Sequence, residues 1–382
     1  MKRRIEYLDA VRGLSVIGIL LVNIHSFSWP EIYDSIPSAY WSSEFEQKIH
    51  HFLSVFIQSS FYPLFALLFG ISMNFIFKGA AARGLNPYII FSKRLIFLFL
   101  LGGFHAFFIW YGDILMVYAV LGFLLLPCYK LSKEKLFLFG LLLWLLPNAL
   151  YGGFLFISDP NLENGSNLPI IKVVIENYIN GMTGRFTQNL IDWLYLYNAE
   201  SWPFIFVSIF PMFLLGLSIA KSDWTTWIQT HPAKIKKMWF LSGGLGLALK
   251  ILPLINPLYL LYHHIAEAFG GPILGLFYAL TVIRLSSKSK RFIKGLSSIG
   301  RMSLSNYLFQ SIIGWTIYKG LHLYGEIPAS INILIALLIV FLQTILSRIW
   351  LLSHSSGPIE QIWNRATYGQ NIKMKNSLKP FH

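Results

Sequence analysis

Apolar residues in this chain are grouped into ten stretches, each about as long as a membrane-spanning helix. A helix needs roughly 20 mainly apolar residues to cross the hydrocarbon core of a bilayer. Short polar loops separate the stretches, which is typical of a polytopic membrane protein. The pattern therefore predicts an all-α membrane helix bundle of about ten transmembrane helices. The stretches cover residues 13–30, 52–77, 91–110, 113–131, 135–156, 202–220, 237–256, 266–285, 303–321 and 329–352.

Lysine and arginine are gathered in every second loop of this pattern. Of the 31 basic residues, 26 fall on one side of the predicted membrane, and this side includes both ends of the chain. Such a bias in short loops marks the cytoplasmic side. We therefore expect a multi-pass protein of the cell membrane with both termini in the cytoplasm. The basic residues left for the other side or the membrane interior are Lys48, Lys172, Arg185, Lys250 and Lys319.

The composition agrees with a membrane protein and excludes several other classes. The chain is 55% hydrophobic and only 13% charged, about half the charged fraction of an ordinary soluble domain. Its net charge of +14 would suggest a nucleic-acid partner in a soluble protein, but here the topology pattern explains it. The single cysteine, Cys128, cannot form an intramolecular disulfide, and no spacing of ligands predicts a metal site. We expect the lipid bilayer as partner and no nucleic acid.

The longest polar connection divides the chain into three parts. Residues 1–156 form an N-terminal half of five predicted spans, which would hold the active site, and residues 202–382 form a second half of five. Residues 157–201 lie between them on the outer side and show a helical pattern from Leu168 to Tyr197. After Gly357, an amphipathic pattern with Trp363 and Tyr368 predicts a cytoplasmic helix at the membrane interface.

Two predicted spans each carry a basic inner end and a polar residue deeper on the same face. Arg12 and Asn23 are 11 residues apart, which places them within about 20° of one helical face and roughly 16 Å apart along the axis. Arg94 and His105 repeat this spacing, with Lys93 beside Arg94, and Asp113 follows His105 after a tight turn. Ionisable groups inside a membrane usually mark function. The arrangement suits a ligand with an anionic head at the cytoplasmic side and a reactive end inside the membrane.

Each of these residues also has a structural alternative. Arg12, Lys93 and Arg94 are also explained as topology signals, and His105 as a hydrogen-bonding group between helices. Asp113 can cap the next helix, a role that is compatible with orienting His105. Asn306 and Gln310 are neighbours on one helical face and would either line a substrate cavity or join two helices. The sequence leaves these alternatives open.

Several motifs in the chain resemble those of the YeiB-like bacterial membrane proteins. The first runs from Tyr7 to Asn23 (YLDAVRGLSVIGILLVN), and the second is FALLFG at residues 65–70. A third contains Gly103-Phe-His105 and WYGDIL at 110–115. The C-terminal half adds GRMSLSNYLFQS at 300–311 and GPIEQIWNRATYG at 357–369. The resemblance covers nearly the whole chain.

This family is grouped with the transmembrane acyltransferases, which include heparan-α-glucosaminide N-acetyltransferase and the sugar O-acyltransferases. The resemblance implies transfer of an acyl group from cytoplasmic acyl-CoA or acetyl-CoA to an acceptor on the far side. The sugar O-acyltransferases have a histidine eleven positions after the first-span arginine, where this chain has Asn23 and the heparan enzyme also has an asparagine. Any catalytic base must therefore come from elsewhere, and His105 is the best-placed candidate.

These observations favour an acyltransferase with defined roles for its residues. Arg12, Lys93 and Arg94 would bind the phosphates of acyl-CoA, and His105 would act as general base. Asp113 would orient His105, and Asn23 would donate a hydrogen bond to the developing oxyanion. The alternative is a transporter or flippase of a small molecule or lipid, whose pathway the same residues would line. The acceptor, a saccharide or a lipid, the acyl chain and assembly as a homo-oligomer are left open.

Overall fold

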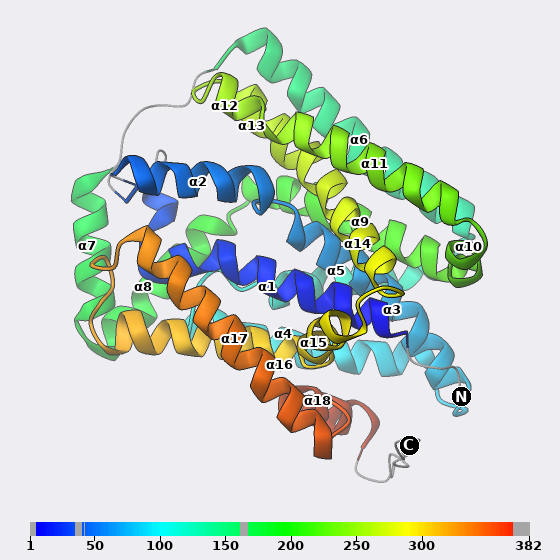
Figure 1. Ribbon diagram of the computed structural model, residues 1–382. Helices are drawn as coiled ribbons and strands as arrows, with labels where there is room; N and C mark the ends of the chain where they lie inside the picture. Colours follow the sequence, from blue (N-terminus) through cyan, green and yellow to red (C-terminus); the bar gives the residue numbers. More distant parts are fainter. Residues whose placement is uncertain (1–4, 35–39, 42, 161–166, 370–382) are drawn as a thin grey trace.

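The computed structural model describes residues 5–34, 40–41, 43–160 and 167–369, and these residues form helices and connecting turns without a β-strand. The predicted all-α fold is confirmed (Figure 1). The basic segments at 1–4 and 370–382, part of the predicted topology signal, lie outside the described residues. The first half contains α1 (Glu6–Ser28), η1 (Glu31–Tyr33), α2 (Glu44–Phe56), α3 (Phe61–Ala81), α4 (Pro87–Phe108), α5 (Leu115–Cys128) and α6 (Lys133–Ser158).

Two intervening helices lead into the second half of the chain. Those two are α7 (Leu168–Ile179) and α8 (Gly181–Leu196), where the sequence predicted a helical segment. The remaining elements are α9 (Ser201–Lys221), α10 (Trp224–Thr230), α11 (Pro232–Lys250), α12 (Leu252–Ile255), α13 (Leu260–Ile265), η2 (Ala266–Gly270), α14 (Gly271–Leu285), α15 (Lys290–Arg301), α16 (Ser303–Gly314), η3 (Trp315–Gly320), α17 (Ala329–Ser353) and α18 (Pro358–Tyr368). The elements η2 and η3 are π-helical.

Eight helical segments of the described chain are long and apolar enough to cross a membrane. They account for eight of the ten predicted spans. The predicted span 113–131 is the shorter helix α5, and the span 303–321 is α16 continued by η3, which carries buried Asn306, Gln310 and Lys319. Most of α6 is exposed and apolar, which suits contact with lipid and would be costly in water. The chain is a multi-pass membrane protein.

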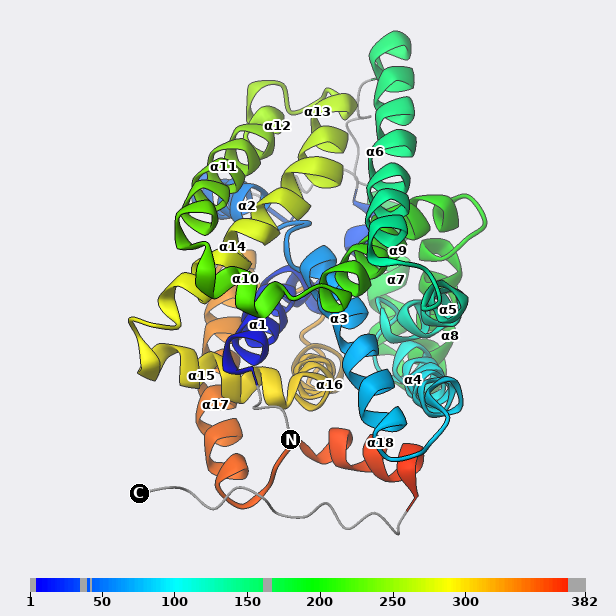
Figure 2. The same cartoon turned by 90° about the vertical axis from the view of Figure 1, so that its right-hand side faces the viewer.

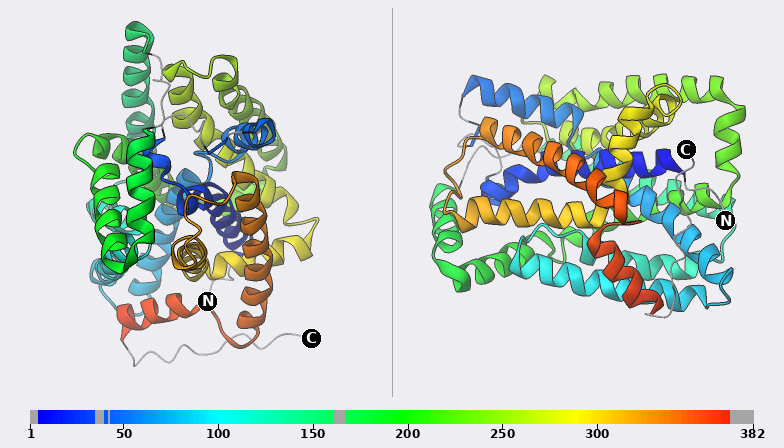
Figure 3. Two further views of the ribbon diagram at one scale, coloured as in Figure 1. Left: turned by 90° about the vertical axis from the view of Figure 1, so that its left-hand side faces the viewer. Right: turned by 60° about the horizontal axis from the view of Figure 1, so that its bottom comes forward.

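The bundle has two distinct ends (Figure 1). Helices α7 and α8 cover one end, which we call the cap end. The short helix α10 and the beginning of α1 lie at the other, which we call the basic end. In the right-hand view of Figure 3, α16 runs toward the cap end, whereas α18 lies on the side of the bundle, in the half nearer the basic end. Figure 2 looks along the bundle and shows α18 lying across it beside the end-on helix α4.

Helices from the two halves of the sequence pack into one another. Helix α1 contacts α15, α16 and α17, and α3 contacts α9. Both main crossings depend on glycine, because a Cβ added at Gly300 would lie 1.8 Å from the Asp9 carbonyl oxygen and one at Gly70 would lie 2.1 Å from that of Phe213. Small residues let membrane helices approach this closely. The predicted halves 1–156 and 202–382 therefore share one packed core.

Local sequence signals set the helix ends that surround the site. Asn86 accepts a hydrogen bond from the Tyr88 amide at 3.0 Å, and Pro87 occupies the first turn, so α4 begins where both residues favour a helix start. Asp113 Oδ2 accepts from the Met116 amide at 2.9 Å and fixes the start of α5. Asp113, in the turn from α4 to α5, is therefore held in a fixed position next to His105.

Candidate functional site

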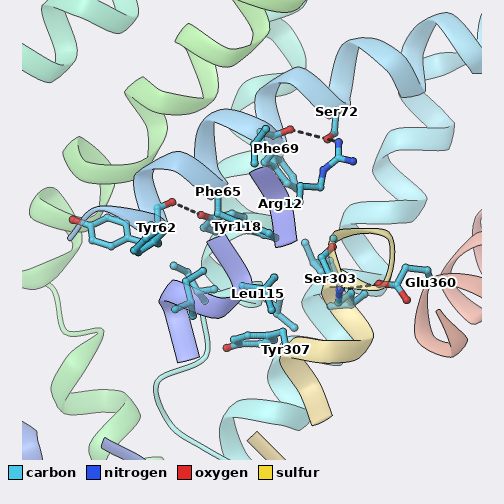
Figure 4. A pocket seen from close by; sticks show the side chains of 18 of the residues that line it. Arg12, Tyr62, Phe65, Phe69, Ser72, Leu115, Tyr118, Ser303, Tyr307 and Glu360 are labelled. Atoms are coloured by element: carbon cyan, nitrogen blue, oxygen red, sulfur yellow. Dashed lines mark hydrogen bonds between the residues drawn. The ribbon is translucent and has the colours of Figure 1, made fainter. Parts of the chain in front are cut away.

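A cavity of about 500 Å³ opens between α1, α3, α4, α5, α16 and α18. Its walls are mainly apolar and aromatic, and they include Phe65, Phe69 and Tyr118 (Figure 4). The polar residues that line it on α1 and α4 lie at different depths, with Arg12 and Arg94 at the basic end and Asn23 nearer the cap end. Both the volume and the lining are typical of a site for an amphiphilic small molecule.

Arg12 and Arg94 are fixed at the basic end of this cavity. Arg12 donates from Nη1 to Asp9 Oδ1 at 2.9 Å. Its Nη2 donates to Ser72 Oγ, also at 2.9 Å, and Figure 4 shows these two side chains together. Arg94 donates from Nη1 to Asn364 Oδ1 at 3.0 Å, and its guanidinium carbon lies 3.9 Å from the centroid of the Trp363 ring. Both arginines therefore line the cavity, one from α1 and one from α4.

Lys93 does not share this position. It is exposed on α4 and is not among the residues that line the cavity. The reason is helical geometry, because consecutive residues on a helix point about 100° apart. Arg94 faces the cavity, so Lys93 faces away. This position supports the alternative that Lys93 is a topology signal.

Asn23 lies farther along α1 and is half-buried in the cavity wall. It stands on the same side of α1 as Arg12, as their spacing predicted. Tyr62 and Tyr118 line the same region and are joined to each other, because the Tyr118 hydroxyl donates to the Tyr62 carbonyl oxygen at 3.0 Å. The amide of Asn23 is therefore a polar group in a mostly aromatic wall.

His105 and Asp113 form a buried pair beside this cavity. His105 Nδ1 lies 2.9 Å from Asp113 Oδ1, and neither side chain is exposed. Asp113 also caps α5 through Met116, so the two roles considered for it coexist. His105 Nε2 is buried and has no hydrogen-bond partner among the described residues. A histidine with one ring nitrogen held by a carboxylate and the other left open has the arrangement of a general base.

One aromatic side chain, that of Tyr307, contacts His105 and also lines the cavity. Tyr307 lines the cavity, and its ring centroid lies 5.3 Å from that of His105. Its hydroxyl is buried and also has no hydrogen-bond partner in the described part of the chain. His105 itself is not among the lining residues. Access from the cavity to His105 Nε2 therefore requires movement of this wall.

Asn306 and Gln310 join two helices and are not among the residues that line this cavity. Asn306 Nδ2 donates to Ser347 Oγ at 3.1 Å, and Gln310 Nε2 donates to Gln343 Oε1 at 2.9 Å. Ser347 and Gln343 belong to α17, so these bonds connect α16 with α17. The amides follow one face of α16 as expected, but that face meets α17. The structure supports helix packing rather than a substrate cavity for these residues.

The comparisons with known proteins identify relatives over almost the whole chain. Residues 219–370 match the family model "Protein of unknown function (DUF418)". The uncharacterised protein YxaH of Bacillus subtilis is 31% identical over 96% of this chain and 94% of its own length. The chain belongs to this YeiB-like family. The uncharacterised protein YeiB of Escherichia coli is 27% identical, over 96% of this chain and 97% of its own length. No solved structure matches the chain.

The part that matches the YeiB-like family model contributes cavity residues that we did not predict. Glu360 of α18 lines the cavity, and its Oε1 accepts from the Leu304 amide at 2.8 Å. It therefore holds the start of α16 against α18. Arg301, Ser303 and Trp363 line the same end. All lie inside motifs that carried the family resemblance, but the contact of Trp363 with Arg94 depends on α18 folding back across the bundle.

The cap end contains a second buried group of polar residues. Asp192 accepts hydrogen bonds from Tyr33 at 2.8 Å, Gln188 at 2.6 Å and Tyr178 at 2.5 Å. Burial raises the pKa of Asp192, and these donors act against that rise by favouring the carboxylate. Lys319 lies nearby, with its Nζ 3.2 Å from Asn189 Oδ1 and 3.5 Å from the Tyr178 ring centroid. Asp192 belongs to α8 and Lys319 to η3, so these two segments meet at the cap end.

Proposed function

We propose that the protein is a membrane acyltransferase that uses acyl-CoA as co-substrate and acts on a saccharide or lipid acceptor. The observation that carries the proposal is one apolar cavity that begins at Arg12 and Arg94 and ends one side chain away from the His105–Asp113 pair. An amphiphile with an anionic head and an acyl tail matches the order of charged, apolar and reactive groups along this cavity. The resemblance to the transmembrane acyltransferases supports the same reaction class.

The proposed step uses the histidine as general base. An acceptor hydroxyl or amine would lose its proton to His105 Nε2 as its oxygen or nitrogen attacks the thioester carbonyl carbon. Asn23 would donate a hydrogen bond to the oxyanion that forms. The carbon–sulfur bond then breaks, and the CoA thiolate leaves with the proton that His105 accepted. Asp113 holds Nδ1 and stabilises the imidazolium between the two transfers.

Substrate binding must displace the wall that covers the base. Tyr307 packs on His105 and lines the cavity, so its side chain has to move before an acceptor reaches Nε2. The aromatic and apolar lining then keeps water from the thioester. This requirement favours transfer over hydrolysis, because the base is open only when an occupant displaces the ring.

We propose that the basic end faces the cytoplasm of a cell-membrane protein, so that both termini are cytoplasmic and cytosolic acyl-CoA meets Arg12 and Arg94. The support is the bias of basic residues toward one side of the membrane.

In a Cys128→Ser background, an impermeant thiol reagent added outside intact cells should label Glu200→Cys at the cap end but not Ser287→Cys. Both positions are exposed. External labelling of Ser287→Cys would overturn the orientation. Asn164, in the same outer connection, lies outside the described residues.

The reaction is tested by radiolabelled acyl transfer from acyl-CoA of several chain lengths in proteoliposomes. His105→Ala should retain binding but lose about 10²–10⁴-fold in rate, as expected for loss of a general base. His25→Ala is a matched control, because His25 is also buried and hydrogen-bonded, with Nδ1 3.1 Å from the Tyr40 hydroxyl. A melting curve of each variant separates lost catalysis from lost stability.

Two results would contradict the proposal. Full turnover by His105→Ala would remove the histidine as base. Asp113→Asn keeps an oxygen to cap α5 but removes the charge, so turnover equal to wild type would reduce Asp113 to a helix cap. If the wild type transfers no acyl group from any acyl-CoA, the transporter or flippase alternative replaces the enzyme.

A further inference from the structure

A second cavity of about 790 Å³ lies at the basic end, between the end of α3, the start of α4 and the face of α18. It shares Phe75, Ile76 and Arg94 with the apolar cavity, so the two spaces adjoin at these residues. Arg83, which follows α3, and Arg365, on α18, both line it. A ligand that fills the apolar cavity would therefore have its head next to this second space.

The second cavity is strongly cationic. Three of its lining residues are arginines and none is acidic. Arg83 and Arg365 are exposed, and in the part of the chain that the structure describes neither forms an ion pair. Arg83 instead lies over the Tyr368 ring, with 4.9 Å from its guanidinium carbon to the ring centroid. The two guanidinium groups keep donors available for an anion, and planar guanidinium is well matched to phosphate.

Arg94 connects the two cavities. Its Nη1 and its planar face are held by Asn364 and Trp363, but its buried Nε has no hydrogen-bond partner among the described residues. A buried unpaired donor on a charged group is costly unless a ligand or water accepts from it. This third arginine is thus fixed in place with one donor unused.

Inner-edge basic residues often serve only as topology signals, and Lys93 illustrates that case. It precedes Arg94 but is exposed and lines neither cavity. Arg83, Arg94 and Arg365 come from three separate places in the sequence and converge on one space. A topology signal needs only the correct side of the membrane, so this convergence needs another explanation.

We infer that the second cavity binds the phosphate-ester head of an amphiphile whose apolar part occupies the first. The identity of that ligand rests on the proposed function, under which the head is the phosphate-bearing nucleotide portion of acyl-CoA. The same chemistry is present in an anionic phospholipid headgroup. Helix α18 supplies Gln361, Asn364 and Arg365 to this cavity, so it covers the head and contributes binding donors.

The test measures binding to the full chain in phosphatidylcholine nanodiscs by calorimetry. The probes are CoA, dephospho-CoA and phosphate-free pantetheine. Arg83→Gln and Arg365→Gln should each weaken CoA binding roughly three- to tenfold, and the loss should shrink at high salt. The same variants should weaken the binding of dephospho-CoA by a smaller factor, and they should leave the binding of pantetheine unchanged. Lys93→Gln is the matched control and should bind CoA as the wild type does.

A second arm identifies the source of the phosphate. In nanodiscs that contain phosphatidylglycerol, native mass spectrometry counts retained anionic lipid. The cavity is assigned to a lipid head if the two arginine variants retain less anionic lipid than Lys93→Gln does and if CoA competes with that lipid. If CoA binding depends on the arginines but no acyl transfer occurs, the inference about the cavity holds and the proposed function is overturned. Arginine variants that bind CoA and anionic lipid like Lys93→Gln overturn the inference.

Discussion

The two ends of the bundle hold their charged side chains in opposite ways. At the cap end, Asp192 accepts three hydrogen bonds, and buried Lys319 donates to Asn189 and lies over Tyr178. At the basic end, Arg83 and Arg365 line a cavity without an acidic residue among its lining. The charged groups at the cap end are therefore paired with other protein groups, whereas the arginines at the basic end face a cavity.

This difference separates structural charge from binding charge. A buried charge whose partners all come from the protein contributes to the fold and is strongly destabilising when one partner is lost. A cation that lines a cavity adds little to the fold, because exposed charges contribute little to stability. The comparison predicts that mutations at the two ends will affect different measurements.

The largest effect is expected at Asp192. Asp192→Ala removes the acceptor of three hydrogen bonds and the charge that offsets Lys319, so the free energy of unfolding should fall by about 3–5 kcal/mol. CoA affinity of the folded fraction should not change, because Asp192 lies at the far end from the cavities. Thermal unfolding in detergent, paired with calorimetry, measures both quantities.

Glu176→Ala provides the matched control for this experiment. Glu176 lies on α7 near the same end but is exposed, so its removal should change stability by less than about 0.5 kcal/mol. An Asp192→Ala protein as stable as Glu176→Ala would contradict the comparison. It would mean that the cap-end hydrogen bonds contribute no net stability.

A smaller effect, on both stability and CoA binding, is expected at Arg94, which is at once held by protein groups and exposed to the cavities. It is held by Asn364 and Trp363 but also lines both cavities. Arg94→Gln should weaken CoA binding about tenfold and lower the free energy of unfolding by roughly 1 kcal/mol, the value of one lost hydrogen bond. If the variant loses stability while its CoA affinity stays unchanged, Arg94 belongs with the structural charges of the cap end.

Much of the site framework followed from spacing along single helices. Arg12 and Asn23 line one cavity because 11 residues bring α1 back to nearly the same face. His105 and Asp113 meet because the turn between α4 and α5 is too short to separate them, and Asp113 caps α5. These are local relations, so periodicity and turn length were enough to predict them.

The partners of other residues were not predictable in this way. The spacing of Asn306 and Gln310 fixed the face they share, but only the packing of α17 decided that the face meets Gln343 and Ser347. Lys93 and Arg94 are indistinguishable as charges, and the rotation of α4 decided which of them lines the cavity. Contacts between distant segments depend on which helix faces meet, and the pattern along one helix does not contain that information.

Hydrophobic length, helix capping and helical period act within a few turns of chain. They were therefore enough to predict an all-α membrane protein, the position of most of its helices and the polar faces of α1 and α4. The tertiary structure decided the cavities, the return of α18 over Arg94 and the enclosure of Lys319 beside Asp192. These features join residues tens to hundreds of positions apart, and they exist only because glycine-mediated crossings let the two halves pack as one bundle.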